Sequence, residues 1–288
     1  MTILPFVAAG IGLGSVYALS GVGIVVLYRA SGTLNFAFGA LGAIGAYCTW
    51  SILPLGVPPA LAWLAGVLVA AAGSFAYGLV IAPRLSHRDR AVRAVGTLGF
   101  ALFILGVTGI FWGEAVPRRL TLPTDHYFAL IFGVRVTYTR LMALILALAM
   151  VGAIALLLSR TRIGLSMRAL AADRHASSLI GIRVVRIDAV AWLISGIFAG
   201  VAGLLLADMV ALNAVFLTFL VIPAIAAAIF GRLQSLAGTA LGGFVAGVIE
   251  AVLSAVPSVA VYRSAAPFVL ALLFITLFGG RRVSALHE

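Results

Sequence analysis

The feature that most constrains this sequence is a series of apolar runs about 20 residues long, the length that a helix needs to cross a bilayer. Short segments that contain arginine separate these runs. Of the 288 residues, 64% are hydrophobic and 9% are charged, whereas a soluble domain carries about 25% charged residues. No globular core could absorb this much apolar surface, so lipid must be the solvent of most of the chain.

Apolar length, with charges and Pro/Gly clusters marking the ends, predicts about nine membrane spans. They lie at residues 3–27, 34–53, 60–82, 95–113, 137–158, 187–209, 217–231, 236–256 and 265–279. The run 217–231 is short and contains Pro223, so a re-entrant or broken helix is an alternative there, and the glycine-rich run 34–53 could also break. We therefore expect an all-α polytopic transmembrane helical bundle.

The placement of arginine predicts the orientation of this bundle, because cytoplasmic loops collect basic residues. If the segment 84–93 is cytoplasmic and the spans alternate, 14 arginines lie inside and 5 lie outside. The inner set is Arg29, Arg84, Arg88, Arg90, Arg93, Arg160, Arg162, Arg168, Arg174, Arg183, Arg186, Arg232, Arg281 and Arg282, and the outer set is Arg118, Arg119, Arg135, Arg140 and Arg263. This favours an outer N-terminus and an inner C-terminus, which an odd number of spans requires.

We expect one transmembrane domain over residues 1–288, with an outer loop at 114–136 and an inner loop at 160–186. Five glycine pairs spaced four residues apart favour close packing of the helices, or faces that can slide. These pairs are Gly10/Gly14, Gly109/Gly113, Gly196/Gly200, Gly238/Gly242 and Gly243/Gly247.

Charge and motif content exclude several functions. The net charge of +11 comes from 19 arginines with no lysine, in short clusters between apolar runs rather than in the basic stripe of a nucleic-acid protein. Without lysine the chain cannot contain a P-loop, and neither HExxH nor GxSxG occurs. The single Cys48 and four scattered histidines make no metal-ligand spacing. We expect no enzyme, no cofactor and no metal site, and ATP, if used, must bind another subunit.

Few polar groups lie inside the predicted spans, and such groups usually face a cavity or a partner. Asn35 opens the second span and is followed by the bulky Phe36 and Phe38. Glu250 lies near the end of the eighth span, where a structural contact, for example with an arginine of an adjoining loop, and a pathway role are equally open. Asn35, Phe36, Phe38 and Glu250 are our candidates for lining a translocation path.

The inner loop 160–186 is patterned rather than irregular. The apolar Ile163, Met167 and Leu170 recur at helical spacing, and Asp173 could cap a second short helix that Gly181 ends. An amphipathic helix on the lipid surface is one interpretation. Docking of a soluble partner is the interpretation that we prefer.

Three stretches resemble a known family. They are Leu13–Gly14–Ser15–Val16–Tyr17–Ala18–Leu19 with Leu34–Asn35–Phe36–Ala37–Phe38–Gly39 and Ile44–Gly45–Ala46–Tyr47, then residues 164–203, and then residues 227–250 with Gly247 and Glu250 in a Gly–x–x–Glu pattern. Together they resemble the permease subunits of branched-chain amino acid ABC transporters, of the LivH type rather than the LivM type. Phe38 stands where these permeases commonly have histidine, which puts the substrate in doubt.

The resemblance implies a bundle with internal pseudo-symmetry in the bacterial inner membrane. It implies a paralogous LivM-type permease subunit or a second copy, two cytoplasmic ATP-binding subunits and a periplasmic substrate-binding protein as partners. It also implies that part of the inner loop docks the ATPase, through Arg168, Ala169, Ala172, Asp173, Arg174 and Gly181. The expected function is import of branched-chain or related small amino acids by alternating access. A stand-alone secondary transporter or channel for a small polar solute is the alternative, and a membrane scaffold that transports nothing is a third.

Overall fold

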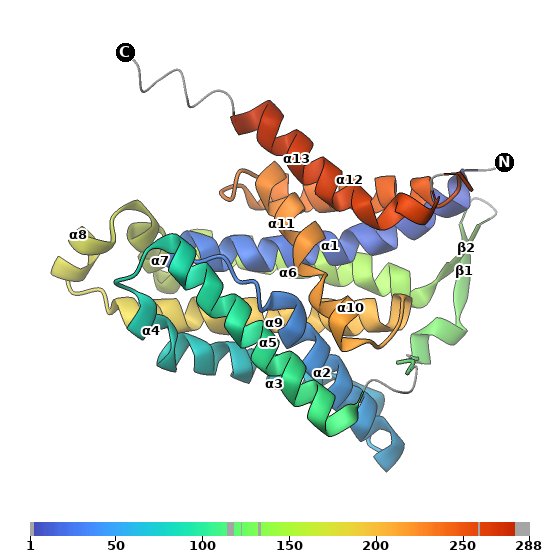
Figure 1. Ribbon diagram of the computed structural model, residues 1–288, viewed down its shortest axis with the longest axis horizontal. Helices are drawn as coiled ribbons and strands as arrows, with labels where there is room; N and C mark the ends of the chain where they lie inside the picture. The colour runs from blue at the N-terminus through green and yellow to red at the C-terminus, as the bar shows by residue number, and fades with distance from the viewer. Residues whose placement is uncertain (1–2, 114–117, 122, 132–133, 259, 280–288) are drawn as a thin grey trace. The chain divides into compact units, whose positions relative to one another are not determined.

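The computed structural model describes residues 3–113, 118–121, 123–131, 134–258 and 260–279, and its helices dominate (Figure 1). The α-helices are α1 (Leu4–Ser31), α2 (Phe38–Ile52), α3 (Pro59–Val80), α4 (Ala82–Leu85), α5 (Arg90–Trp112), α6 (Tyr138–Arg160), α7 (Arg162–Ala172), α8 (Arg174–Leu179), α9 (Val184–Met209), α10 (Ala214–Thr218), α11 (Val221–Phe230), α12 (Leu236–Leu253) and α13 (Ala266–Gly279). Three short 3₁₀ helices lie at η1 (Leu53–Leu55), η2 (Pro123–His126) and η3 (Ala260–Ala265).

Within these described residues, seven helices are long and apolar enough to cross a membrane, namely α1, α2 with η1, α3, α5, α6, α9 and α12. Each coincides with one of the predicted runs. The run 217–231 is not among them, because the chain forms two short helices, α10 and α11, interrupted at Phe219 and Leu220. Pro223 lies in the first turn of α11, where a missing N–H costs no helical hydrogen bond. The run 265–279 becomes α13, which is 14 residues long. The count of nine crossings stays a prediction.

The outer loop contains a feature that an all-α expectation lacks. Strands β1 (Phe128–Ile131) and β2 (Val134–Thr137) pair antiparallel, with Phe128 opposite Thr137 and Ile131 opposite Val134. Val134, Val136 and Thr137 are β-branched, and such residues favour an extended backbone. Residues 114–117, 122 and 132–133 of the predicted loop 114–136, and the inner-set arginines Arg281 and Arg282, lie outside the described residues.

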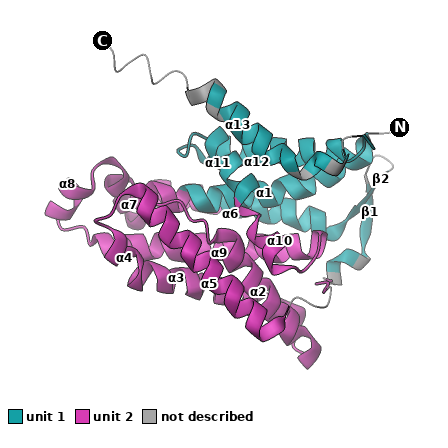
Figure 2. Ribbon diagram, in the orientation of Figure 1, with its two compact units in different colours: residues 1–25, 124–151, 222–288 teal, residues 26–123, 152–221 magenta. Residues whose placement is uncertain are grey.

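The chain divides into two compact units (Figure 2). Unit 1 comprises residues 1–25, 124–151 and 222–288, and unit 2 comprises residues 26–123 and 152–221. Helices α1 and α6 each contribute to both units.

In unit 2, helices α2, α3 and α9 form the packed centre. Glycines permit the close approach of their backbones: a Cβ added at Gly200 would lie 2.9 Å from Cα of Val67, and one at Gly42 would lie 2.7 Å from the carbonyl oxygen of Ala199. Neither position has room for a side chain, and the van der Waals contact of small residues is what holds helices together in lipid.

In unit 1, helices α1 and α12 pack through the same kind of contact. A Cβ added at Gly10 would lie 2.6 Å from Cα of Val248, and one at Gly14 would lie 2.8 Å from Cα of Phe244. Gly10 thus lies beside Val248, and Gly14 lies beside Phe244. Because the higher number on α1 pairs with the lower number on α12, the two helices run antiparallel. The predicted close packing is therefore present at Gly10/Gly14, whereas Gly109 and Gly113 have nothing within 4 Å.

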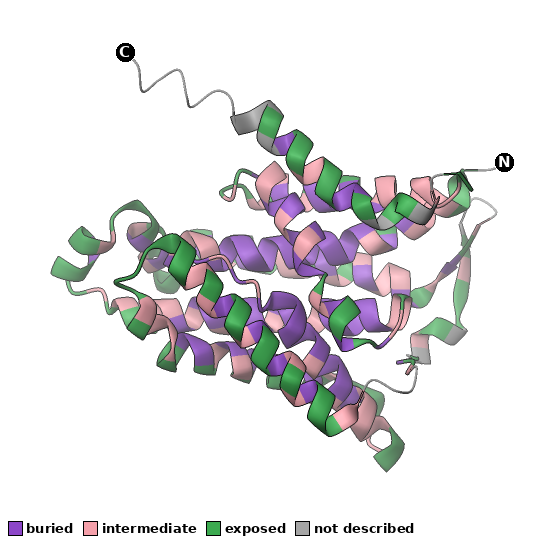
Figure 3. Cartoon of the chain, viewed as in Figure 1, coloured by how far each residue is buried: buried purple, intermediate pink, exposed green. Residues whose placement is uncertain are grey.

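Burial separates inner from outer helices (Figure 3). Most of α1 and α9 is buried, while α5 and α6 expose large apolar side chains such as Leu102, Phe103, Ile110, Ile145 and Leu148. Large exposed apolar faces in a soluble protein would drive association. On helices of spanning length they fit contact with lipid, and the chain is a multi-pass membrane protein.

Candidate functional site

The segment between α1 and α2 holds two of the predicted path residues, Asn35 and Phe36, and a third, Phe38, opens α2. Asn35 is 1% exposed, and its Oδ1 accepts a 3.0 Å hydrogen bond from the amide of Ala37. Asparagine commonly closes such a turn on the backbone two residues later. Its Nδ2 is buried and makes no hydrogen bond to the protein. The turn thus fixes the amide plane of Asn35 and leaves one buried donor for another acceptor.

Helix α5 holds this linker in place through two side chains one turn apart. The amide of Phe36 donates a 3.0 Å hydrogen bond to Oγ1 of Thr97, which lies 3.1 Å from the carbonyl oxygen of Leu34. One turn earlier, Nη1 of Arg93 donates a 2.9 Å hydrogen bond to the carbonyl oxygen of Ser31. The backbone on either side of Asn35 is therefore anchored to α5.

The two phenylalanines differ in environment. Phe38, in the first turn of α2, is fully buried, while Phe36 is half-buried. The next residue, Gly39, packs against the carbonyl groups of Leu217 and Thr218 at the end of α10, where a Cβ would overlap them. Asn35, Phe36 and Phe38 thus lie together at the linker and the start of α2, within unit 2.

Glu250, the fourth predicted path residue, belongs to unit 1. Its Oε2 accepts a 2.8 Å hydrogen bond from the hydroxyl of Tyr17 on α1. Arg263 in η3 is near enough to act on the carboxylate electrostatically. The hydrogen-bond partner of Glu250 is thus a tyrosine within the bundle rather than an arginine of a loop.

The inner loop folds as two short helices, as the sequence indicates. Thr161 caps α7, with its Oγ1 accepting a 3.1 Å hydrogen bond from the amide of Gly164. Asp173 caps α8, with Oδ1 accepting from the amides of Ala176 at 3.0 Å and His175 at 2.8 Å. These amide hydrogen bonds, from Ala176 first and then His175, hold the pKa of the exposed Asp173 carboxyl below its ordinary value. Gly181, with φ of +89°, follows α8 in the left-handed conformation that glycine favours.

One detail of α7 differs from the expectation. Met167 and Leu170 are buried, but Ile163 is 42% exposed. The inward face instead begins at Gly164, which contacts the backbone of Leu157 and Leu158 where α6 ends. A glycine there lets α7 fold back closely onto α6, and this rotates Ile163 outward.

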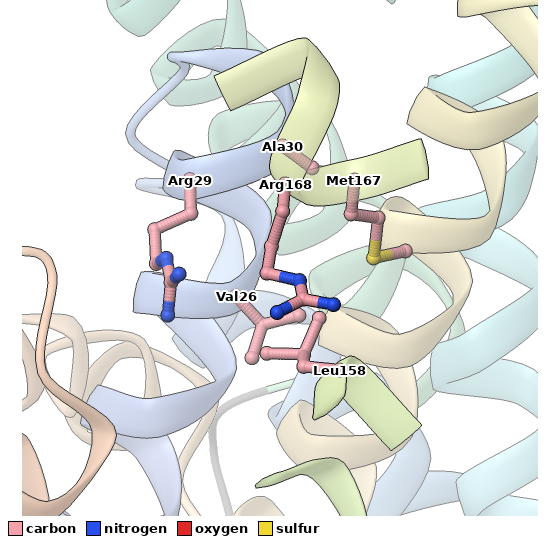
Figure 4. Close-up of a pocket in the computed structure, with 6 residues that line it drawn as sticks. All are labelled: Val26, Arg29, Ala30, Leu158, Met167 and Arg168. Carbon is pink, nitrogen blue, oxygen red and sulfur yellow. The ribbon is translucent and has the colours of Figure 1, made fainter. Parts of the chain in front are cut away.

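A small pocket lies where α7 meets the ends of α1 and α6 (Figure 4). It is lined by Val26, Arg29, Ala30, Leu158, Met167 and Arg168. The side chain of Arg168 extends toward Val26 and Leu158 (Figure 4). Of the other predicted docking residues on these helices, Ala172 and Asp173 are exposed and Ala169 is half-buried.

Arg174 engages the protein itself. Its guanidinium forms a two-pronged ion pair with Asp188 on α9, and Nη1 also donates a 2.7 Å hydrogen bond to the carbonyl oxygen of Ala30 in α1. Whether Arg174 also contacts an ATPase stays a prediction.

Four residues have roles in these arrangements that the sequence did not predict: Tyr17, Arg93, Thr97 and Asp188. Arg93 counted only as a loop charge, although it lies within α5. Asp188 carries the clearest signal, a carboxylate just inside a predicted span. Tyr17 and Thr97 carry no signal of their own, because only the packing of α1 on α12 and of α5 on the linker gives them partners. No group of three His, Cys, Asp or Glu side chains among the described residues could hold a metal ion.

Comparison with known proteins covers nearly the whole chain. A family model described as "Branched-chain amino acid transport system / permease component" matches residues 6–278. The chain is 28% identical over 285 residues to the high-affinity branched-chain amino acid transport system permease protein LivH of Salmonella typhimurium, covering 92% of this chain and 90% of that protein. It is 33% identical over 227 residues to the permease protein LivM of the same organism, covering 67% of this chain and 50% of LivM.

A solved structure has a similar fold. One chain of PsaBC from Streptococcus pneumoniae in complex with Fab matches with a TM-score of 0.51 and 12% identity, covering 96% of this chain and 91% of that one. At this identity the likeness concerns the fold alone.

Proposed function

The chain belongs to the family of permease components of branched-chain amino acid transport systems, and from this membership we propose that it forms half of the translocation path of an ATP-driven importer. It is a transport subunit rather than an enzyme. The observation that carries the proposal beyond membership is the inner loop. Two capped helices, α7 with a buried inward face and α8 with only Ser177 buried, lie outside the helices of spanning length. They leave Arg168, Ala172 and Asp173 exposed.

The partners follow from this role. The relatives are named as permease proteins of branched-chain amino acid transport systems, one of the LivH and one of the LivM kind. We propose a LivM-type permease subunit, or a second copy of this chain, as the other half of the path. Two cytoplasmic ATP-binding subunits and a periplasmic binding protein complete the complex, because the lysine-free chain offers no P-loop of its own.

The proposed mechanism is alternating access. Closure of the ATPases on ATP displaces the inner loop 160–186, through Arg168, Ala169, Ala172, Asp173, Arg174 and Gly181, and the helices re-pack to open the path inward. Asn35, Phe36, Phe38 and Glu250 line or gate this path. The buried, unpaired Nδ2 of Asn35 supports such a role, because a buried donor is costly unless an acceptor, such as a group of the substrate, binds to it.

The proposed topology has nine crossings, an outer N-terminus and an inner C-terminus in the bacterial inner membrane, with internal pseudo-symmetry. Arginine placement supports the orientation. A reporter fused after Glu288 is expected to be cytoplasmic. A periplasmic reporter would overturn this topology without touching the assignment to the family.

Uptake in reconstituted vesicles tests the transport mechanism. The chain, its partner permease, the ATPase subunits and the binding protein are reconstituted together, and uptake of labelled leucine, isoleucine and valine is measured with and without ATP. The matched control contains an ATPase variant that binds but does not hydrolyse ATP. We expect uptake only when ATP is present and the ATPase subunits can hydrolyse it. Uptake without the ATPases would instead make the protein a stand-alone transporter or channel. Failure to take up these three amino acids, with ATP-dependent uptake of another small solute, would correct the substrate alone.

A further inference from the structure

Arg174 on α8 and Arg93 on α5 donate hydrogen bonds to the last carbonyl groups of α1. These carbonyl groups directly precede the linker that contains Asn35. We propose that Arg174, Asp188 and Arg93 are positioning residues that couple the inner loop to the Asn35–Phe38 segment through the end of α1. This inference rests on the proposed function and names the route by which displacement of the loop reaches the path. All the residues involved belong to unit 2.

The end of α1 is the junction of this route. The last carbonyl groups of a helix have no partner within it and carry partial negative charge, so cations bind there favourably. The carbonyl oxygen of Ala30 accepts from Nη1 of Arg174 at 2.7 Å, and that of Ser31 accepts from Nη1 of Arg93 at 2.9 Å. Neighbouring carbonyl groups are thus tied to α8 on one side and to α5 on the other.

On the side of the loop, Arg174 is the first residue of α8, directly after the capping Asp173. Its ion pair with Asp188 fixes the guanidinium to the beginning of α9 while a third bond holds Ala30. A planar guanidinium can satisfy a carboxylate and a carbonyl at once, which an ammonium group does less well. Displacement of α8 must therefore move the end of α1 or break a charge-assisted bond.

On the side of the path, the linker is short and tightly bonded. The amide of Thr33 donates a 3.2 Å hydrogen bond to Oγ of Ser31, and Phe36 is bonded to Thr97 one turn beyond Arg93. Only four residues separate Ser31 from Phe36, so a shift of the end of α1 against α5 cannot be absorbed by slack chain. The shift reaches Asn35.

Charge balance ties the three side chains into one unit. Asp188 forms the ion pair with Arg174 and also attracts Arg93, whereas Arg174 and Arg90 repel Arg93, so one carboxylate offsets the repulsion between two arginines. The side chain of Asp188 is 16% exposed, which limits screening of its charge by water, while Arg174 is more exposed, at 35%. Neutralising Arg174 leaves the outer faces of α7 and α8, and the cap at Asp173, in place. The substitution should therefore separate docking of the ATPases from coupling.

The experiment measures substrate imported per ATP hydrolysed by the full reconstituted complex carrying R174Q. We expect the ATPases to co-purify and ATP hydrolysis to continue, while import per ATP falls at least about tenfold. Loss of a single charge-assisted hydrogen bond already corresponds to about that factor, and R174Q removes the two bonds to Asp188 as well as the bond to Ala30. R174K retains the positive charge but not the planar guanidinium, which bonds Asp188 and Ala30 at once. We therefore expect its import per ATP to lie between those of R174Q and the wild type. The matched control is R183Q, which removes an exposed arginine just before α9 and should leave import per ATP unchanged.

Two results would overturn the inference. In one, R174Q imports as much per ATP as the wild type. In the other, R174Q no longer retains the ATPases, so that the loss of import follows from the docking role proposed above for Arg174 and not from coupling through Ala30. If R174Q does not accumulate in the membrane, D188N decides, because it retains Arg174 and its bond to Ala30 and should still lower import per ATP. A wild-type complex that imports nothing with ATP would refute the proposed function itself, whatever the variants do.

Discussion

The hydroxyl of Tyr17 donates a 2.8 Å hydrogen bond to Oε2 of Glu250, although 233 residues separate them in the chain. Side chains of a helix tilt toward its N-terminus, so on antiparallel helices they tilt toward each other. Tyr17 on α1 and Glu250 on α12 converge in this way. Between them lie Gly14 and Gly247, which pack in direct contact and leave room for both side chains.

The coupling energy of this pair is the first prediction. Y17F and E250A are each expected to lower the free energy of unfolding, because phenylalanine removes the donor and alanine removes the acceptor. A double-mutant cycle should give a coupling of about 0.6 kcal/mol, the average for hydrogen bonds between membrane helices, and no more than about 1.7 kcal/mol. Unfolding in detergent or lipid measures it. The control is Y262F, at a tyrosine that is 70% exposed. Additive effects of Y17F and E250A would show that the bond contributes nothing.

The charge of Glu250 is a separate question from its hydrogen bond. Glu250 lies in the last turn of α12, where the helix dipole disfavours a carboxylate. Replacement by the neutral, isosteric glutamine should therefore change stability by less than about 1 kcal/mol. If Glu250 lines the path, E250Q will nevertheless slow ATP-driven uptake. Unchanged uptake by a stable E250Q complex would remove Glu250 from the path.

The contact of α1 with α12 leaves no room for a methyl group. G14A places Cβ 2.8 Å from Cα of Phe244, a backbone atom that cannot rotate away. We expect a loss of about 1–3 kcal/mol, the usual cost of overpacking, read as a lower unfolding midpoint. The control is G109A on α5, where nothing lies within 4 Å, so alanine should be neutral or slightly stabilising because it favours helix. Equal effects of the two substitutions would contradict this packing.

Because Asp173 caps α8, amide hydrogen exchange in this helix should depend both on substitution of Asp173 and on pH. D173A should increase amide hydrogen exchange in Arg174–Leu179, whereas D173N should not, since asparagine caps as well as aspartate. Because folding lowers the pKa of Asp173, its contribution is complete above the unfolded value of about 3.9 and is lost as pH falls through the lower folded value. Exchange in α8 should therefore rise only below about pH 4 in the wild type and show no such step in D173N. A cap lost near neutral pH would contradict the assignment.

Much of the local structure could be predicted from short stretches of sequence. Asp173 and Gly181 delimit a short helix by local hydrogen bonding and backbone freedom, and both expectations are confirmed. Ile163 was assigned to the wrong face, since apolar spacing alone cannot reveal that Gly164 allows α7 to fold back onto α6. The β-hairpin of the outer loop was missed because four-residue strands give too little alternation to stand out.

Apolar length and arginine clusters determined by themselves that this is a multi-pass membrane protein, because the cost of burying charge in lipid acts on every segment independently. The permease family came from the resemblance of three stretches of sequence. The tertiary structure alone decided which polar residues are partners. Tyr17 finds Glu250, and Arg174 finds Asp188 and Ala30, only because close helix contacts bring distant segments within hydrogen-bond reach. Hydrogen bonds act over about 3 Å, and no spacing along the sequence encodes that distance.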